Sequence, residues 1–181
     1  MNIAILTPLF PPDIGEPAPY AKLLANKLAD AEHNVSVLLY GHLPENISGV
    51  KFVCTDKRKW TFVRLYLYTM RLLMKYRKFD LLIINNGLSC EFPATYIMPF
   101  RKSSTVLVIS DPIAKAKSRS GMYKNVHENL KNKVTATIDI TEETDRHKPE
   151  IHPFKPVSDI TISNHDKWWN RHLEEILSYG K

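Results

Sequence analysis

The sequence predicts an α/β fold: a Rossmann-like three-layer α/β/α sandwich with a mainly parallel sheet. Short runs rich in Val, Ile and Leu alternate along the chain with longer segments whose apolar residues recur at helical spacing. The short runs are nearly continuous in apolar residues, which is typical of parallel strands covered on both faces. With 44% apolar residues among 181, and no repeat with a period of about 20 to 50 residues, the chain predicts a single globular domain over residues 1–181.

The individual elements follow from the same patterns. The predicted strands lie at residues 2–7, 35–40, 50–54, 79–85, 105–110, 134–140 and 159–163. The predicted helices lie at residues 17–31, 59–78, 92–101 and 120–131, and a last one begins at Asn164 and stops at Gly180. Pro17 suits the first turn of its helix, where a backbone N–H is not needed. The polar, proline-containing stretch 141–157 predicts an exposed loop.

Charge is unevenly distributed along the chain. The formal net charge is +6, and residues 51–78 contain nine Lys or Arg but only one acid. Such a surplus favours anionic partners, such as phosphate-bearing ligands, acidic lipid head groups or nucleic acid. The chain has no RNA-recognition, KH or zinc motif beside this charge, so nucleic acid is the least expected of the three.

Cysteine usage and the N-terminus suggest a location. The two cysteines, Cys54 and Cys90, have neither metal-ligand spacing nor a disulfide framework. Residues 1–8 lack the cationic start and long apolar stretch of a signal peptide. We therefore expect a cytoplasmic protein, without a membrane-spanning helix. Asp145, His147 and His152 fall in the polar loop without a regular spacing, so we expect no metal site.

Ligands of such folds bind beyond the carboxyl ends of the strands. The loops at 8–16, 41–49, 85–91 and 110–120 are therefore the candidate sites. The first of them delivers Gly15 to a helix start, where free N–H groups favour a phosphate or carboxylate; a simple chain turn would also account for this glycine. The chain contains neither G-x-G-x-x-G nor G-x-x-x-x-G-K, which argues against a dehydrogenase or a P-loop NTPase.

Three segments carry a family resemblance. Residues 2–15 read Asn-Ile-Ala-Ile-Leu-Thr-Pro-Leu-Phe-Pro-Pro-Asp-Ile-Gly, residues 32–38 read Glu-His-Asn-Val-Ser-Val-Leu, and residues 158–163 read Ser-Asp-Ile-Thr-Ile-Ser. These resemble the opening strand and Pro-Pro-x-x-Gly-Gly loop, the G-H-x-V-x-V strand and the late A-D-x-I-x-x-S strand of retaining GT-B glycosyltransferases, the glycogen-synthase-like group 1 family. The first two segments carry most of the resemblance.

The resemblance implies a role in sugar transfer. In that family the N-terminal lobe mainly holds the acceptor, which is a glycan or lipid-linked, and a C-terminal lobe mainly holds a nucleotide-sugar. This chain would be the N-terminal lobe alone, inactive without a donor-binding lobe in the same or a separate chain. Gly15 and Glu16 would approach the donor diphosphate. The sugar or acceptor site would include Asn86, Gly87, Ser110 and Asp111. The nucleotide-sugar is a substrate, so no cofactor is expected, and no catalytic residue can be named.

Two departures from the family pattern support an alternative. Glu16 stands where the family has a second glycine, and a carboxylate there would repel a diphosphate. Ser110 stands where the family often has a histidine, and a hydroxyl cannot replace an imidazole in proton transfer. The alternative is a non-catalytic binding or adaptor module derived from such a lobe.

The segment 59–78 predicts a helix with a basic stripe. On a helical wheel its cations fall close together, with aromatic side chains at the border: Arg64, Arg71, Lys75 and Lys78, flanked by Trp60 and Tyr68. Such a helix could lie on an anionic membrane surface, at the inner face of the membrane. The same pattern also fits a core helix with a basic solvent face.

Overall fold

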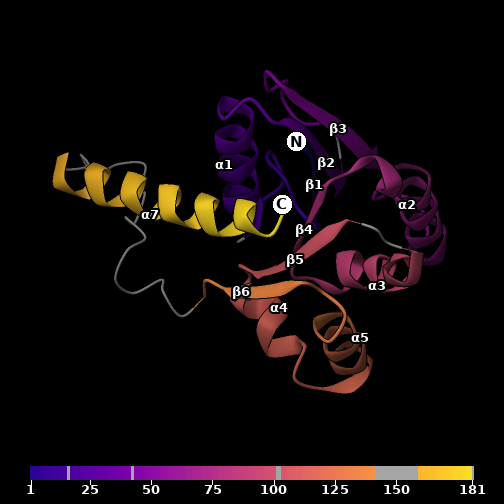
Figure 1. The fold of residues 1–181 in the computed structure, drawn as a ribbon. Coiled ribbons are helices and arrows are strands. Elements are labelled where there is room, and N and C mark those ends of the chain that lie inside the picture. The colour runs from indigo at the N-terminus through magenta and orange to yellow at the C-terminus, as the bar shows by residue number, and fades with distance from the viewer. Residues whose placement is uncertain (16, 42, 101–102, 142–158, 181) are drawn as a thin grey trace.

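A computed structural model describes residues 1–15, 17–41, 43–100, 103–141 and 159–180 (Figure 1). Its centre is one six-stranded sheet, parallel throughout, in the order β3-β2-β1-β4-β5-β6. The strands are β1 (Asn2–Thr7), β2 (Asn34–Tyr40), β3 (Val50–Thr55), β4 (Leu81–Asn85), β5 (Ser104–Ile109) and β6 (Ala136–Asp139). The predicted Rossmann-like α/β fold is confirmed.

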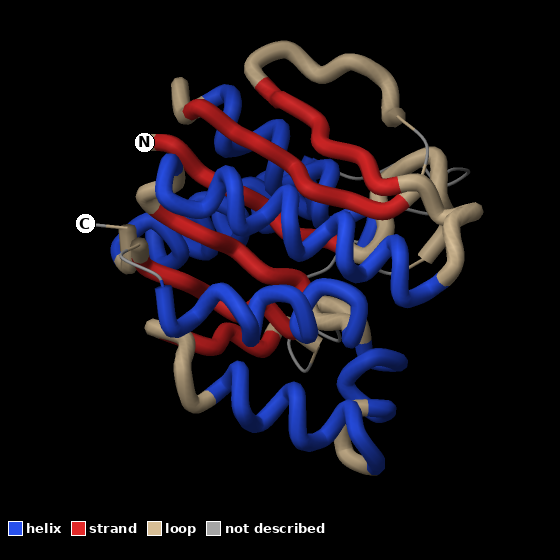
Figure 2. The backbone as a smooth tube through the Cα atoms, turned by 90° about the vertical axis from the view of Figure 1, so that its right-hand side faces the viewer, coloured by secondary structure: helices blue, strands red, loops and turns tan. Residues whose placement is uncertain are grey.

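Helices cover both faces of this sheet. They are α1 (Pro17–Asp30), α2 (Thr61–Lys75), α3 (Leu88–Ile97), α4 (Pro112–Lys117), α5 (Gly121–Lys131) and α7 (Asp159–Ser178), with short 3-10 turns η1 (Tyr76–Lys78) and η2 (Met98–Phe100). Figures 1 and 2 show the three layers, with α1 and α7 on one face and α2 and α3 on the other. Among the described residues, no helix combines the length and apolar character needed to cross a membrane.

Alternation along the strands builds two separate cores. On β1, Ile3 and Ile5 point into a core shared with α1 and α7, whereas Ala4 and Leu6 point into a core shared with α2, α3 and α5. All four side chains are fully buried. This double burial explains why the strands are almost continuously apolar.

The predicted strand at 159–163 is wrong, because these residues form the first turns of α7. The segment is rich in β-branched residues, but its local strand preference is overridden. Helix α7 runs on without a break to Ser178, and its later turns pack Trp169 and Ile176 into the α1-side core. Since β6 occupies the last position of the sheet, the segment adds no seventh strand.

Other boundaries differ in smaller ways. Helix α3 begins at Leu88, four residues before the predicted start at 92, directly after Gly87. After β5, where the sequence predicts a helix only at 120–131, the chain also forms the short helix α4. The predicted loop at 141–157 lies outside the described residues from 142 onward.

One aromatic cluster fixes α7 against the domain. The Trp169 ring stacks on Tyr20 of α1 with ring centroids 5.6 Å apart. The Tyr20 hydroxyl lies 2.8 Å from Nε2 of His172, and this pair is also buried. Helix α7 therefore closes the α1 face through its indole and imidazole side chains.

Replacing Trp169 by Ala should lower the free energy of unfolding by about 3–5 kcal/mol, because the indole leaves a cavity between α1 and α7. Urea unfolding followed by circular dichroism measures the change. Glu174→Ala, an exposed position on the same helix, is the control and should change the value by less than about 0.5 kcal/mol. Equal values for the two variants would show that α7 is not packed as described.

Candidate functional site

The sheet order places a natural binding edge between β1 and β4. The chain leaves β1 toward β2 on one side and leaves β4 toward β5 on the other, so the loops that follow these two strands diverge. Ligands of open α/β sheets bind in the crevice that such divergence creates. The loops after β1, β4 and β5 meet at this rim.

A pocket of about 540 Å³ opens at this rim, on the α2 side of the sheet. Its walls are Pro8 and Leu9 after β1, the first turns of α2, the start of α3 and the residues 111–117 after β5. Tyr123 of α5 closes one side. Two residues predicted for the sugar site, Gly87 and Asp111, line this pocket together.

Asn86 holds the rim together from beneath. Its Oδ1 accepts hydrogen bonds from the backbone N–H groups of Ser110 and Asp111, both at 2.9 Å, and its Nδ2 donates to the Asp111 carbonyl at 2.8 Å. The side chain is completely buried. The prediction that this amide faces sugar hydroxyls therefore does not fit the structure, in which the amide fixes the β5 loop to the β4 loop.

Gly87 allows two loops of the rim to approach each other. Its φ of +152° is a conformation that favours glycine, and a side-chain carbon placed here would lie 3.1 Å from Cγ of Pro8. Its N–H donates to Oε1 of Glu91 at 2.9 Å. Gly87 thus shapes the pocket floor and leaves the β1 loop close to α3.

The two carboxylate oxygens of Asp111 differ in their hydrogen bonds. Its Oδ1 accepts hydrogen bonds from the N–H groups of Ile113 at 2.8 Å and Ala114 at 3.1 Å, and so caps α4. No hydrogen bond to Oδ2 is found within the described chain. The second oxygen can therefore accept a hydrogen bond from a ligand hydroxyl.

A buried carboxylate supports the pocket wall. Glu91 of α3 is 0% exposed and accepts hydrogen bonds from the Tyr123 hydroxyl at 2.7 Å and from Nδ1 of His127 at 2.8 Å. The hydrogen bond with Glu91 raises the pKa of His127 above its usual 6.5, although burial acts in the opposite direction. Burial, together with the Glu91 charge, also raises the pKa of Tyr123. Tyr123 consequently keeps its proton and is held in place at the pocket by Glu91.

Two cations give the pocket its charge. Arg64 of α2 and Lys117 of α4 both line it, and neither forms an ion pair with a described carboxylate. Nε of Arg64 is buried and has no hydrogen-bond partner among the described residues. The residue nevertheless lines the pocket, and a guanidinium without an ion pair there is suited to a phosphate or carboxylate group of a ligand.

Further unsatisfied polar atoms lie at the carboxyl ends of β4 and β5. They are both amide atoms of Asn85 and the hydroxyl of Ser110, buried and without partners within the described ranges. Ser110, predicted for the sugar site, is 3% exposed and does not line the pocket. Buried groups left unpaired in this way concentrate at functional or strained positions.

Of the two residues predicted for the diphosphate site, the structure describes only Gly15. Gly15 lies against Leu9, whose side chain would overlap a side-chain carbon on the glycine, and its carbonyl accepts the N–H of Ala18 at 3.0 Å. It is not among the residues that line the 540 Å³ pocket. Glu16 lies outside the described residues. The structure thus groups Gly87 and Asp111, with Asn86 beneath them, but leaves Gly15 apart.

The predicted basic stripe of α2 is divided. Tyr68 is 1% exposed, its ring stacked on Tyr40 at 4.4 Å, so its predicted membrane contact is wrong. Arg71 donates hydrogen bonds to the carbonyl of Cys54 and to Oγ1 of Thr55. Arg64 belongs to the pocket just described, so Arg64, Arg71 and Tyr68 of the predicted stripe are engaged within the protein, whereas Trp60, Lys75 and Lys78 are exposed.

The exposed face of α2 carries apolar side chains instead. Trp60, directly before the helix, and Phe62, Tyr66 and Met74 are 72%, 68%, 62% and 71% exposed. Their neighbours Arg58, Lys59, Lys75 and Lys78 are exposed cations. A helical wheel shows which side chains of α2 lie on the same side of the helix. It does not show which side packs against the sheet and which side faces solvent.

Sequence reasoning missed the roles of Lys117, Tyr123, Glu91 and His127. Lys117 falls within a loop that the strand order selects, but nothing singles it out there. Glu91 and His127 are 36 positions apart, and only the packing of α3 against α5 brings them together. Among the described residues, no group of three or more His, Cys, Asp or Glu could hold a metal ion.

Comparisons with known proteins give one kind of match. No protein-family model and no curated sequence matches the chain. Among solved structures, sucrose-phosphate synthase from Thermosynechococcus elongatus is similar, with a TM-score of 0.56 and 14% sequence identity. The match covers 75% of this chain and 41% of that structure. At this identity the similarity establishes the fold, which agrees with the α/β architecture described above.

Removing His127 should change how stability depends on pH. Because its folded-state pKa is raised, the charged imidazole stabilises the fold fully below about pH 6.5, and this contribution is lost as pH rises through the folded pKa. His127→Gln should therefore lower the free energy of unfolding by about 1.5–3 kcal/mol at pH 5.5 and by less at pH 8.5. Urea unfolding across this pH range measures the difference.

The control for this experiment is His33→Gln. Burial lowers the pKa of His33, so its charged form opposes folding at low pH. The control should therefore gain stability relative to wild type as pH falls. A pH-independent effect of His127→Gln would contradict the ion pair with Glu91.

Proposed function

We propose that this chain is the acceptor-side lobe of a GT-B glycosyltransferase of the retaining, glycogen-synthase-like group. The similarity to a sucrose-phosphate synthase supports the general reading, and the chain spans 41% of that structure. The expected complete enzyme has a second, donor-binding lobe, in the same or another chain, that closes over the carboxyl rim. In this proposal the isolated chain binds acceptor but does not turn over.

The observation that carries the proposal is the cationic pocket at the junction of β1, β4 and β5. Arg64 and Lys117 would hold an anionic group of the acceptor, such as the phosphate of a sugar phosphate. The free Oδ2 of Asp111 would accept a hydrogen bond from a sugar hydroxyl, and Leu9 and Leu65 offer apolar contact to a sugar ring. Reaction with the nucleotide-sugar would then take place at the open side of the pocket.

The residues around the pocket have supporting roles in this proposal. Asn86 and Gly87 would fix the shape of the rim, and Glu91 would hold Tyr123 as one wall. Gly15, just before α1, would face the donor diphosphate across the cleft rather than the acceptor, and Glu16, the next residue in the sequence, is proposed for the same role. Ser110, buried behind the rim, would contact ligand only after a local movement.

The alternative is a binding module without catalysis. Ser110 favours this reading, because the position lacks an imidazole and its hydroxyl is buried. Both readings use the same acceptor pocket. An activity assay distinguishes them: it asks whether any natural form that has a donor lobe transfers sugar from a nucleotide-sugar. Turnover would exclude the binding-module reading.

Arg64→Gln should weaken binding of a hexose 6-phosphate about ten- to a hundredfold, because a charge-assisted hydrogen bond contributes about 1.5–3 kcal/mol. Isothermal titration of the wild type with the hexose phosphate and with the parent hexose measures the contribution of phosphate. Arg58→Gln is the matched control, since this exposed arginine pairs with Asp56 away from the pocket. Equal binding by the two variants would overturn the proposed role of the pocket.

We also propose that the exposed face of α2 rests on an anionic membrane, at its inner, cytoplasmic side. Its apolar side chains are bordered by exposed cations, and this combination favours acidic lipid surfaces. A lipid-linked acceptor would then reach the rim beside the first turn of α2.

The triple variant Phe62→Ser, Tyr66→Ser and Met74→Ser should reduce sedimentation with phosphatidylglycerol vesicles at least tenfold, since burial of apolar area contributes most of such binding. A composition-matched control is available on other exposed surfaces: Phe100→Ser, Tyr96→Ser and Met122→Ser. Equal loss in both triples, or no binding by wild type, would contradict the membrane proposal.

A further inference from the structure

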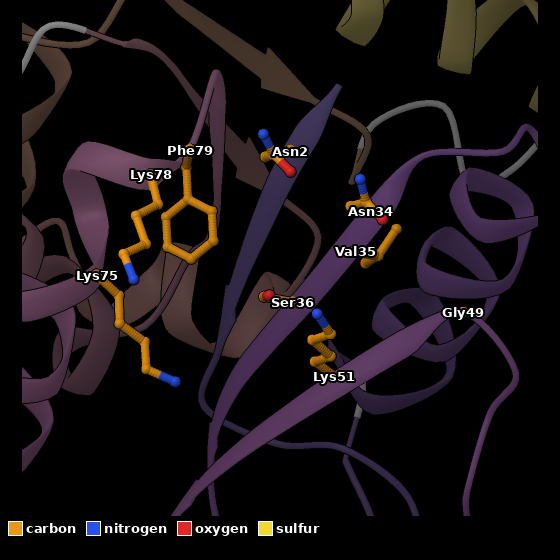
Figure 3. A pocket seen from close by; sticks show the side chains of 9 residues that line it. All are labelled: Asn2, Asn34, Val35, Ser36, Gly49, Lys51, Lys75, Lys78 and Phe79. Atoms are coloured by element: carbon orange, nitrogen blue, oxygen red, sulfur yellow. The ribbon is translucent and has the colours of Figure 1, made fainter.

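A second polar pocket lies at the opposite end of the sheet from the candidate acceptor site. It has a volume of about 320 Å³ and is lined by residues near the amino ends of β1 and β2, by the start of β3, and by the end of α2 with η1 (Figure 3). Lys51, Lys75 and Lys78 all contribute to its lining.

The pocket exists because α2 stops short of the edge of the sheet. The helix ends at Lys75, and η1 then turns the chain toward Phe79 and β4. This leaves part of the sheet uncovered where Ser36 of β2 pairs with Lys51 of β3. Figure 3 shows Lys75 and Lys78 reaching in from one wall and Lys51 from the other, with Ser36 between them.

Within the part of the chain that the structure describes, the three ammonium groups form no ion pair with a carboxylate. The ion pairs found among the described residues use other cations, namely Lys27, Lys57, Arg58, Lys115 and His127. Asp80 lies directly before β4, and its Oδ2 accepts a hydrogen bond from the backbone N–H of Asn2 at 2.7 Å. Three positive charges around one pocket repel each other, which costs free energy. A bound multivalent anion would replace this repulsion by attraction.

The remaining lining supplies neutral donors. The side chains of Asn2, Asn34 and Ser36 carry amide and hydroxyl groups. Several N–H and O–H donors around a cationic centre match the acceptor oxygens of a phosphate. The volume has room for a phosphate with a small attached group, and the Phe79 ring offers an apolar wall to that group.

We propose that this lysine pocket, defined by Lys51, Lys75 and Lys78, is a binding site for a phosphate group, carried by a small phosphorylated molecule or by a lipid head group. It is distinct from the proposed acceptor site: Arg64 and Lys75 are 11 positions apart on α2, about 16 Å along the helix axis. The inference does not depend on the proposed function.

Nuclear magnetic resonance titration with inorganic phosphate and pyrophosphate tests the proposal on the full chain. We expect saturable shifts of the backbone amides of Ser36, Gly49 and Lys51. The amides of Gly87 and Ser89 report separately on the acceptor site, so that failure at one site is not confused with failure at the other. Absence of saturable shifts at the first group would overturn the proposal.

The decisive variant is Lys51→Gln, Lys75→Gln and Lys78→Gln. It should weaken pyrophosphate binding at Ser36 and Gly49 at least tenfold, whereas Lys124→Gln, Lys131→Gln and Lys133→Gln, exposed lysines with the same change in net charge, should change it less than twofold. Equal weakening in both triples would show a general charge effect and no site. At low salt and without phosphate, the first triple should melt no lower than wild type, because repulsion is relieved; a large drop would mean that the lysines are structural.

Vesicle sedimentation distinguishes the two sources of phosphate. If the ligand is a lipid head group, wild type binds phosphatidylglycerol vesicles more tightly than phosphatidylcholine vesicles, and Lys51→Gln, which leaves Lys75 and Lys78 beside the exposed face of α2 in place, reduces this difference whereas Lys124→Gln does not. If the ligand is a free phosphorylated molecule, pyrophosphate binding depends on the three lysines while Lys51→Gln and Lys124→Gln bind vesicles equally. Equal vesicle loss in these two single variants, without phosphate shifts, contradicts the proposal.

Discussion

The structure depends on parallel pairing between β1 and β4, which brings segments almost eighty positions apart into register, Ile3 beside Leu81. Because all strands run the same way, every carboxyl end lies at one rim and every amino end at the other. Burial on both faces fixes this register, since a shift by one residue would exchange the side chains of the two cores. The two candidate sites are consequences of this pairing, one at each rim.

At the carboxyl rim, polar interactions turn an edge of the sheet into a shaped pocket. The Asn86 amide joins the β5 loop to the β4 loop, and Glu91 joins α3 to α5. Both side chains are fully buried, and their hydrogen bonds offset the cost of removing polar groups from water. Such buried networks set geometry more than they add stability. Asn86 and Glu91 therefore hold other residues in place. The side chains available to bind a ligand are those of Arg64, Lys117 and Asp111.

The sequence predicts the architecture well because double burial leaves a direct signal, the continuous apolar runs of β1, β2, β4 and β5. It fails at 159–163, where β-branched residues match a strand but the backbone forms the first turns of α7. Among site residues, Gly87 and Asp111 are predictable because they follow strands directly. Glu91 and His127 are not, since their pairing depends on how α3 meets α5, and no spacing in the chain encodes that contact. The predicted membrane contact of Tyr68 is wrong for a similar reason, because a helical wheel gives the angles between side chains but not which side of the helix packs against the sheet.

Helix α2 connects these observations, because each of its arcs meets a different environment. Tyr68 and Leu72 enter the core, Arg64 reaches the carboxyl-rim pocket near its start, and Lys75 reaches the lysine pocket at its end. The remaining arc presents Phe62, Tyr66 and Met74 to solvent. A core helix with a purely solvated outer face would not need large apolar side chains there, since their exposure costs free energy in water. Of the cations on α2 and on the turn that follows it, Arg64 lines one pocket and Lys75 and Lys78 line the other, whereas Arg71 is bound to β3. In the membrane proposal, the apolar arc between the two pockets is the surface that would rest on the lipid.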